Sequence, residues 1–306
     1  MFSSSPAYAF ALYVSLRTFF NNSPKLASSS DIYVYGWKWS ETLKRLISSC
    51  GPVQVVDYDI PSDIPRTPFI MKFTPALFAR FEGFNLLEKY ENVVCLDSDI
   101  LVQKELVGVL EEMTENIGVT QDSCPTVGHN FIAAPEGNYD LSQPCYNAGF
   151  LVLKRAGFPV SGDKVASWLY SMLRRCADTV YLGDQGLINL ALQEFHLTPF
   201  IFPDLYNLPA SSSRKKLKKA SIVHSTGHRK FWCYYYFHTW CKYYFEYRLA
   251  GGEPLTVRKN TLLWDKMLKK FSKEKCIFFE LAPDVFRYPG KFMLFAIQWF
   301  FHRKRL

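Results

Sequence analysis

The sequence predicts an α/β fold, with a mostly parallel mixed sheet and helices on both faces. Short apolar runs of strand length alternate with longer segments of helical pattern, as in strand–helix–strand units. One of these runs, residues 92–96, is followed directly by two acids, Asp97 and Asp99. An apolar run that ends abruptly in acids is typical of a central strand whose carboxyl end meets a ligand-binding crevice.

The remaining elements follow from the same pattern. Residues 1–22 predict a short stub of strand and an amphipathic helix. Ser40 is a preferred capping residue, so we expect it to begin a helix that runs to residue 47. Periodicity and turn residues place the others. The expected strands are 31–35, 53–58, 93–96, 117–120, 145–153, 198–202 and 220–224, and the expected helices are 75–88, 105–115, 163–176 and 187–193.

The chain of 306 residues changes in composition near residue 232. We expect one α/β domain over residues 1–232 and a helical extension over residues 233–306. The extension is rich in aromatic residues, and its last part, residues 292–306, is an apolar run with a basic end. This run is too short to cross a bilayer, but it can lie in the membrane interface as a peripheral contact. The alternative is a terminal helix packed on the core, with a solvated basic end.

Charge and cysteine usage restrict the partners and the compartment. The net charge of +8 suits anionic partners such as a sugar nucleotide, a phosphorylated acceptor or an anionic membrane, but it is too diffuse to indicate nucleic acid. The 8 cysteines show no zinc-type spacing. We therefore expect reduced thiols in a cytoplasmic protein, peripheral to a membrane, with a disulfide-bonded lumenal domain as the alternative. Residues 6–20 resemble a signal-peptide core, but no basic region precedes them and Arg17 interrupts them.

Asp97 and Asp99 are candidate metal ligands. They stand two residues apart at the predicted end of a strand, where the bending backbone allows both to reach one ion. Two hard oxygen donors suit Mg²⁺ or Mn²⁺ held together with a phosphate, rather than Zn²⁺. The alternative is a solvated turn, since Asp and Ser are ordinary turn residues.

Four further stretches carry polar residues of interest. His224 and Lys230 follow a predicted strand and can supply an imidazole to a metal and an ammonium to a phosphate, with Gly227 between them allowing close backbone approach. Asn147 can hydrogen-bond sugar hydroxyls, or it is simply a turn residue. The other three have ordinary structural interpretations, namely helix capping for Asp184 and Gln185 and a surface ion pair for Arg80.

Taken together, these stretches resemble glycosyltransferase family 8, the retaining enzymes that include glycogenin and bacterial lipo-oligosaccharide α-galactosyltransferases. The resemblance runs from about residue 2 to Trp232. It depends on Arg80, the turn Leu96-Asp97-Ser98-Asp99, Tyr146-Asn147-Ala148-Gly149, Gly183-Asp184-Gln185-Gly186-Leu187-Ile188-Asn189, and the spacing of His224, Gly227, Lys230 and Trp232.

The resemblance implies a GT-A fold, which is Rossmann-like, a UDP-sugar donor and Mn²⁺, with Mg²⁺ as the alternative metal. It implies that Asp97, Asp99 and His224 hold the metal. The nucleotide-sugar would be bound by Tyr8, Arg80, Asp97, Ser98, Asp99, Asp122, Asn147, Gly227 and Lys230. Among these, Tyr8 would stack on uracil, while Lys230 and the backbone of Gly227 would contact the diphosphate. Asp184 and Gln185 would be the catalytic residues, stabilising the cationic anomeric centre.

Three departures from the family pattern concern the donor site. The first strand is a stub, Ser5 and Pro6 stand where the family has acids before the stacking tyrosine, and Phe231 replaces a common proline. The first two changes indicate either that translation begins upstream or that uridine binding is weakened. The loss of the proline removes only a turn preference.

The expected function is retaining transfer of glucose or galactose from a UDP-hexose to a hydroxyl of a carbohydrate, glycolipid or protein acceptor. The basic residues 214–219 are expected to overhang the cleft, where they can meet an anionic acceptor, or to form a solvated loop. One alternative is a glycogenin-type self-glucosylating primer, because the chain has 18 tyrosines. The other is a catalytically impaired nucleotide-sugar-binding protein.

Overall fold

The computed structural model describes residues 1–226, 230–231 and 239–253. Its strands are β1 (Phe2–Ser4), β2 (Ile32–Gly36), β3 (Val53–Asp57), β4 (Asn92–Leu96), β5 (Ile100–Val102), β6 (Ile117–Thr126), β7 (Pro144–Lys154), β8 (Pro199–Phe202), β9 (Leu208–Pro209) and β10 (Ile222–His224). Its α-helices are α1 (Ala9–Asn22), α2 (Pro24–Ser28), α3 (Glu41–Ser48), α4 (Pro68–Phe73), α5 (Glu82–Asn85), α6 (Val109–Glu112), α7 (Gly162–Cys176), α8 (Asp184–Glu194), α9 (Arg214–Leu217) and α10 (Thr239–Leu249). Short 3₁₀ helices connect several of them.

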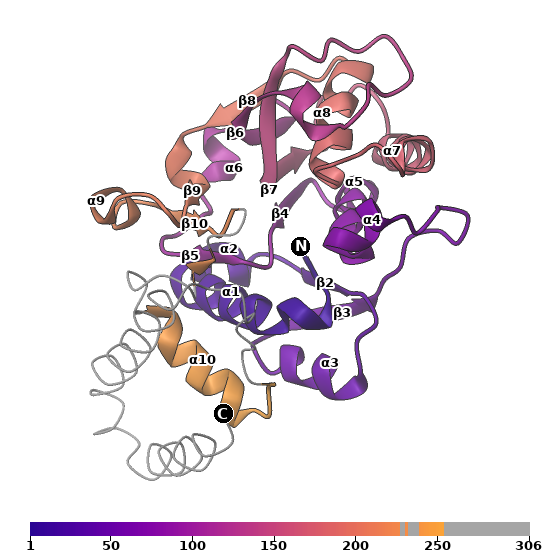
Figure 1. Cartoon of the computed structure of the whole chain (residues 1–306). Helices are drawn as coiled ribbons and strands as arrows, with labels where there is room; N and C mark the ends of the chain where they lie inside the picture. Colours follow the sequence, from indigo (N-terminus) through magenta and orange to yellow (C-terminus); the bar gives the residue numbers. More distant parts are fainter. Residues whose placement is uncertain (227–229, 232–238, 254–306) are drawn as a thin grey trace.

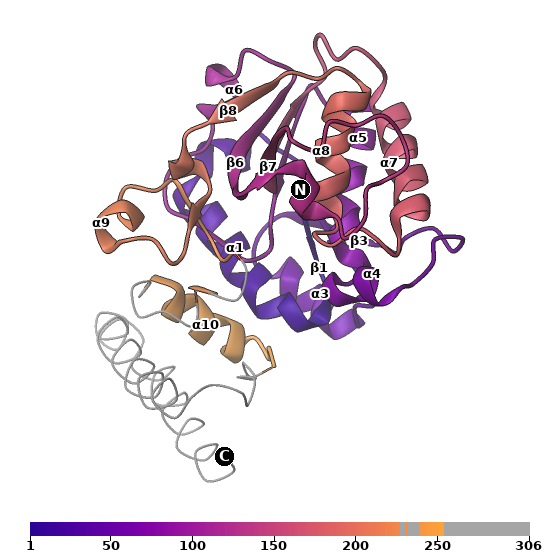
Figure 2. The same ribbon diagram turned by 45° about the horizontal axis from the view of Figure 1, so that its top comes forward.

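The predicted α/β class is confirmed. Strands β1, β2 and β3 are parallel neighbours, β4, β7, β6 and β8 form a second group, and β5, β10 and β9 form a third. Within the second group β7 runs antiparallel to both β4 and β6, whereas β6 and β8 are parallel. Figures 1 and 2 show α7 and α8 on one side of these strands and α1 on the other.

The short first strand lies at the centre of the molecule. β1 pairs in parallel with β2, and the carbonyl of Met1 accepts a 2.9 Å hydrogen bond from the Leu96 N–H of β4. The N-terminus is accordingly marked beside β4 in Figure 1. A strand of three residues therefore connects the first two groups of strands.

Alternate side chains of β4 and β7 enter two separate cores. Leu96 and Phe150 pack with α1 and α3, whereas Cys95 and Leu151 pack with α5, α7 and α8. Successive residues of a strand point to opposite faces, so strands with helices on both faces are apolar throughout. This burial fixes where β4 ends, and hence where the two acids after it begin.

Two predicted helices are wrong in extent. Residues 75–88 form a 3₁₀ turn, the short helix α5 and another 3₁₀ turn, and they begin after Thr74, which has a positive φ of 67°. Of residues 105–115 only Val109–Glu112 is helical. The carboxylate of Glu105 instead accepts hydrogen bonds from the N–H groups of Lys25 and Leu26 at the start of α2.

The described part of the C-terminal extension packs on the first helix. In α10 the ring of Trp240 lies 5.8 Å from that of Phe10, and Glu246 pairs with Arg17 at 2.9 Å. No helix in the described ranges is both long and apolar enough to cross a membrane. Residues 292–306 lie outside the described residues, so their membrane contact stays a prediction.

Helix α1 also holds the acidic turn in place. The hydroxyl of Ser15, which is fully buried, lies 2.7 Å from the carbonyl oxygens of Ser98 and Ile100 and 3.2 Å from the Ile100 nitrogen. A buried backbone group that loses its partner costs free energy. Ser15 is therefore a structural support for the turn that carries Asp97 and Asp99.

We expect Ser15→Ala to lower the free energy of unfolding by about 1–3 kcal/mol, because it leaves buried backbone groups of the turn without a partner. Urea denaturation followed by circular dichroism measures the change. Ser48→Ala, at the exposed end of α3, is the control and should change the free energy by less than about 0.5 kcal/mol. Equal stability of the Ser15 variant and the wild type would contradict this role.

Candidate functional site

The two acids and the histidine converge at one point. The Asp97 N–H donates to the Gly149 carbonyl on β7 at 3.0 Å, and the Ser225 N–H donates to the Asp99 carbonyl at 3.1 Å. Antiparallel pairing of β5 with β10 sets His224 opposite Ile100, next to the turn. His224 Nε2 lies 3.0 Å from Asp97 Oδ2 and 3.4 Å from Asp99 Oδ1. One ligand atom from each of the three residues lies within 4.8 Å of the others, so together they can hold a divalent metal ion.

Gly149 makes room for this cluster. A methyl group at its Cα would lie 2.3 Å from His224 Cε1 and 2.8 Å from Asp97 Oδ2. Any side chain at position 149 would therefore push the ligands apart. The donor set of two carboxylates and one imidazole, and the space kept open by this glycine, fit a divalent metal ion.

Two further cations neutralise the acids. Lys230 Nζ lies 2.6 Å from Asp99 Oδ2 and 2.9 Å from the Ser225 carbonyl oxygen. The Arg80 guanidinium, almost fully buried, donates to both Asp97 and Asp184. The expectation that Arg80 is a surface ion-pair residue is wrong, since it is an internal bridge between the acidic turn and the start of α8.

These pairings move the pKa values in opposite directions. Burial alone would raise the pKa of Asp97 and Asp99, but the neighbouring cations, Arg80 for Asp97 and Lys230 for Asp99, together with His224, hold both below their ordinary value. Burial would lower the pKa of His224, but its hydrogen bonds to the two acids raise it to about 9. For Asp184, burial dominates over Arg80 and raises the pKa to about 6.

Next to the acids lies a network of buried amides. Asn147 Nδ2 donates to Asp122 Oδ2 at 2.6 Å and to Gln185 Oε1 at 3.0 Å. Gln185 Nε2 donates in turn to Asn130 Oδ1 at 3.0 Å. Asn147, Asp122 and Gln185 come from β7, β6 and α8, so three elements meet here. Such a network fixes the orientation of each amide.

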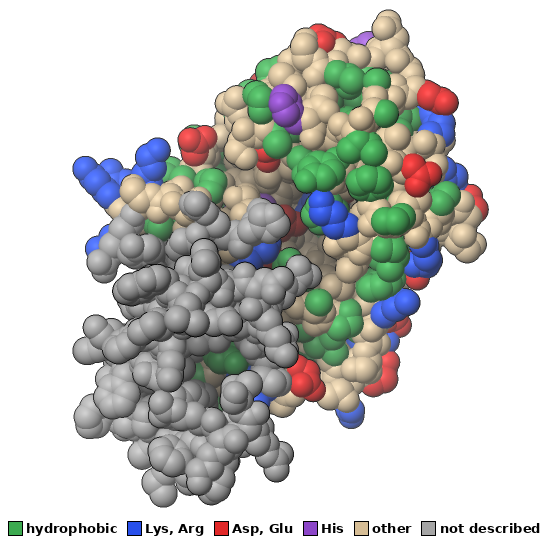
Figure 3. All heavy atoms as spheres, viewed as in Figure 1, with side chains coloured by type: hydrophobic (Ala, Val, Ile, Leu, Met, Phe, Trp, Pro, Cys, Tyr) green, Lys and Arg blue, Asp and Glu red, His purple; other side chains and the backbone are tan. Residues whose placement is uncertain are grey.

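Most of the site residues expected from the sequence lie close together in the structure. The exception is Gly227, about which the structure gives no information. Tyr8, 38% exposed at the end of a 3₁₀ turn, has its ring centroid 5.4 Å from Lys230 Nζ. Ser98 is half-buried inside the acidic turn. Gly227 lies outside the described residues. Near the centre of Figure 3, acidic and histidine atoms lie in a hollow between basic and apolar side chains.

Sequence patterns did not single out three residues that shape the site. Ser15 supports the turn, Gly149 leaves space for the ligands, and Asn207 hydrogen-bonds His224 Nδ1 at 2.8 Å. Gly149 belongs to the stretch Tyr146-Asn147-Ala148-Gly149, but the sequence gives no sign of its steric role. Asn207 belongs to no motif, and only its position just before a short strand offered a signal.

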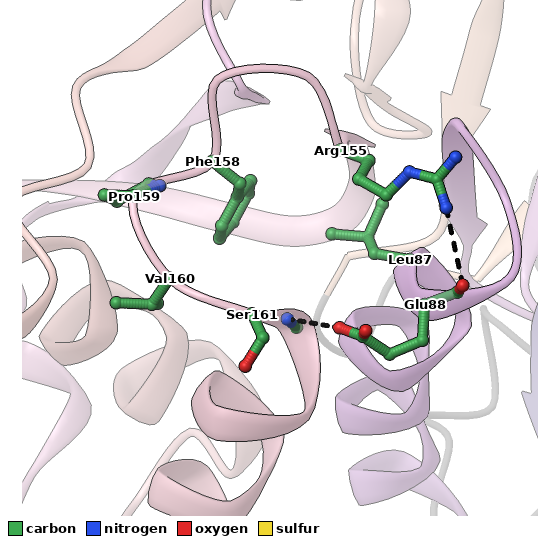
Figure 4. A pocket seen from close by; sticks show the side chains of 8 residues that line it. Leu87, Glu88, Arg155, Phe158, Pro159, Val160 and Ser161 are labelled. Atoms are coloured by element: carbon green, nitrogen blue, oxygen red, sulfur yellow. Dashed lines mark hydrogen bonds between the residues drawn. The ribbon is translucent and has the colours of Figure 1, made fainter.

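Two other features lie apart from these residues. A hollow of about 370 Å³ is lined by residues of the 3₁₀ turn after α5 and of the loop before α7 (Figure 4). Glu88 there accepts a 2.8 Å hydrogen bond from the Gly162 N–H, so this acid serves the start of α7. The basic stretch 214–219 begins as helix α9, which Figure 1 shows at the edge of the molecule, away from β4. That placement does not support the expectation that it overhangs the cleft.

Comparison with known proteins agrees with this architecture. Three solved structures share the fold, each at less than 20% sequence identity: WbbM, described as a bifunctional glycosyltransferase (TM-score 0.58, 17% identity), the galactosyltransferase LgtC in complex with donor and acceptor sugar analogues (0.55, 18%), and the glycosyltransferase GlyE of Streptococcus pneumoniae TIGR4 (0.51, 16%). The alignments cover 88%, 84% and 90% of this chain, and 50%, 96% and 63% of the respective structures. The chain thus spans about half the length of WbbM.

No curated protein sequence matches the chain significantly. The family model described as "Glycosyl transferase family 8" matches residues 1–235, which is most of the chain. The fold is the GT-A type of its structural neighbours, and the acidic turn Asp97-Ser98-Asp99 is its Asp-x-Asp motif. The chain therefore belongs to glycosyltransferase family 8.

Proposed function

We propose that this protein is a retaining, Mn²⁺-dependent hexosyltransferase that moves glucose or galactose from a UDP-sugar to an acceptor hydroxyl. The observation that carries the proposal is the convergence of Asp97, Asp99 and His224 on one point, with Lys230 and Arg80 in contact with the acids. Two carboxylates and one imidazole, with cationic side chains beside them, suit a metal ion that is bound together with a diphosphate. The glycosyl-transfer part of the proposal rests on membership of glycosyltransferase family 8.

Cleavage of the sugar–phosphate bond leaves negative charge on the diphosphate. When bound, the metal ion would neutralise part of this charge as it develops. Lys230, whose ammonium lies 2.6 Å from Asp99, would supply a second positive charge to the diphosphate. The backbone of Gly227 is proposed to contact the same diphosphate, and Ser98 to line the nucleotide beside it.

The anomeric carbon becomes cationic as the bond breaks. Asp184 and Gln185, at the start of α8, are proposed to stabilise this cation. Arg80 contacts both Asp184 and Asp97, and this supports a fixed relation between the proposed sugar-binding and metal-binding groups. Asn147 and Asp122 are proposed to hydrogen-bond the hydroxyls of the donor sugar, and Tyr8 to stack on uracil. The anomeric configuration is retained if the leaving diphosphate guides the acceptor hydroxyl onto the face of the sugar that it leaves.

The acceptor is proposed to be a carbohydrate, a glycolipid or a protein hydroxyl. LgtC, which shares the fold, is described with donor and acceptor sugar analogues, which favours a carbohydrate acceptor. Residues 1–232 would carry the transfer, and residues 233–306 would contact the acceptor or a membrane. A glycogenin-type self-glucosylating primer is the second candidate. The intact pairs around Asp97 and Asp99 favour an active enzyme over a catalytically impaired binding protein.

The proposal is tested by incubating the purified protein with a panel of UDP-sugars, without acceptor, in Mn²⁺ and in EDTA. We expect release of UDP from UDP-glucose or UDP-galactose in Mn²⁺ only. Release in EDTA at the same rate would contradict the metal dependence. Release from only a non-hexose donor would contradict the assigned sugar.

We expect Asp99→Asn to reduce the turnover number at least a hundredfold, because a neutral amide is a poor metal ligand and no longer pairs with Lys230. Coupled detection of UDP measures the rate, and a thermal melt shows whether the fold is kept. Asp178→Asn, at an exposed position, is the matched control and should keep wild-type activity. Wild-type turnover in the Asp99 variant would refute the metal assignment.

Metal binding is expected to release about one proton at pH 7. The pKa of His224 is about 9 without metal, so the ring is protonated at pH 7, whereas a metal ligand must be neutral. Both acids already have lowered pKa values and add no proton. The Mn²⁺ affinity should therefore rise about tenfold per pH unit between pH 6.5 and 8.5.

Titration calorimetry in two buffers of different ionisation enthalpy measures the proton release directly. The His224→Asn variant serves as the control, because it has no proton to lose at this position. A pH-independent affinity without proton release would contradict the assignment of His224 as a ligand.

A further inference from the structure

Asn207 lies between the candidate metal ligands and the amides of the proposed sugar site. It directly precedes β9, which pairs in parallel with β10, the strand that ends in His224. Its side chain is 7% exposed. Asn207 Oδ1 lies 2.8 Å from His224 Nδ1, and Nδ2 lies 2.6 Å from Asn147 Oδ1 and 2.9 Å from Thr120 Oγ1. One buried amide therefore contacts both halves of the site.

Two hydrogen-bond partners fix which end of the Asn147 amide is the oxygen and which is the NH₂ group. The Gly149 backbone N–H can only donate, and it lies 2.8 Å from Asn147 Oδ1. On the other side of the amide, Asn147 Nδ2 donates to Asp122 Oδ2 at 2.6 Å. Asn147 must therefore turn its oxygen toward Asn207.

The same logic then fixes Asn207 and His224. Because Asn147 presents an oxygen, Asn207 must present its NH₂ group to it, and the Asn207 oxygen is left facing His224. That oxygen can only accept, so His224 Nδ1 must carry a hydrogen. In the neutral ring the lone pair is then on Nε2, the nitrogen that faces Asp97 and Asp99.

We propose that Asn207 is a positioning residue that sets the tautomer of His224 for metal binding and couples the metal ligands to the donor-sugar amide Asn147. This inference rests on the proposed function, because it concerns the metal and the donor of that reaction. A hydrogen-bond partner on the second nitrogen of a ligating histidine orients the ring and raises metal affinity. No motif of the family resemblance includes Asn207.

The test measures Mn²⁺ affinity by electron paramagnetic resonance titration of the protein without any sugar. We expect Asn207→Leu to weaken Mn²⁺ binding about 10- to 100-fold, because the Nδ1–H of His224 loses its acceptor and the ring is free to present that nitrogen instead. Asn189→Leu is the matched control. Asn189 is also buried, but its amide bonds the backbone of Tyr146 and Gln185 and not His224, so its loss should leave Mn²⁺ affinity within twofold of wild type.

A second variant separates the two couplings. Asn207→Asp keeps an acceptor for the Nδ1–H of His224, so Mn²⁺ affinity should stay within threefold of wild type or rise. Its other carboxylate oxygen would face Asn147 Oδ1, two acceptors in contact, so the Michaelis constant for the UDP-sugar should rise at least tenfold. A role in folding alone would move both quantities together or neither.

Folded Asn207→Leu that binds Mn²⁺ as tightly as wild type would overturn the inference and leave the proposed function intact. If Asn207→Leu weakens Mn²⁺ binding while the wild type itself transfers no sugar, the inference is supported and the proposed function is contradicted. If Asn207→Leu does not fold, Asn207→Asp decides, since loss of Mn²⁺ affinity in that variant contradicts the assigned hydrogen-bond direction. Absence of Mn²⁺ binding by the wild type would overturn both.

Discussion

The arrangement of the site depends on the neutralisation of buried carboxylates. Asp99 and Asp184 are buried and Asp97 is half-buried, and an unpaired charge in such a place is costly. Each acid has a cation in contact: Arg80 serves Asp97 and Asp184, and Lys230 serves Asp99. The charges therefore hold together elements that are far apart in the sequence. The same attraction that stabilises the metal-free site makes it suited to a divalent ion and an anionic ligand.

The candidate metal ligands could be located from sequence because they lie at the ends of recognisable elements. The acids follow a buried apolar strand, and His224 ends another, so local patterns locate both. Asn207, Ser15 and the steric role of Gly149 could not be predicted, because their contacts join elements distant in the chain. Among the elements, residues 105–115 match a helical pattern, yet Glu105 is engaged with α2. Tertiary contacts override local preference there.

The departures at the N-terminal end affect the nucleotide side more than the fold. The three residues of β1 pair with β2, and the Met1 backbone hydrogen-bonds β4, so this strand connects the first two groups of strands. Tyr8 is exposed, and its ring lies beside Lys230, as the proposed stacking on uracil requires. Ser5 and Pro6 supply no charge where the family pattern has acids. Recognition of uridine here would thus depend on stacking and on the diphosphate contacts.

The central claim is that Asp97, Asp99 and His224 hold a metal ion that also binds the donor diphosphate. Pulsed electron paramagnetic resonance of the Mn²⁺ protein with UDP tests it most directly, because it detects the nuclei in contact with the metal. We predict coupling to a directly bound imidazole nitrogen that disappears in His224→Gln, together with coupling to phosphorus that appears only with UDP. Bound Mn²⁺ without the nitrogen coupling, or without phosphorus coupling in the presence of UDP, would contradict the account.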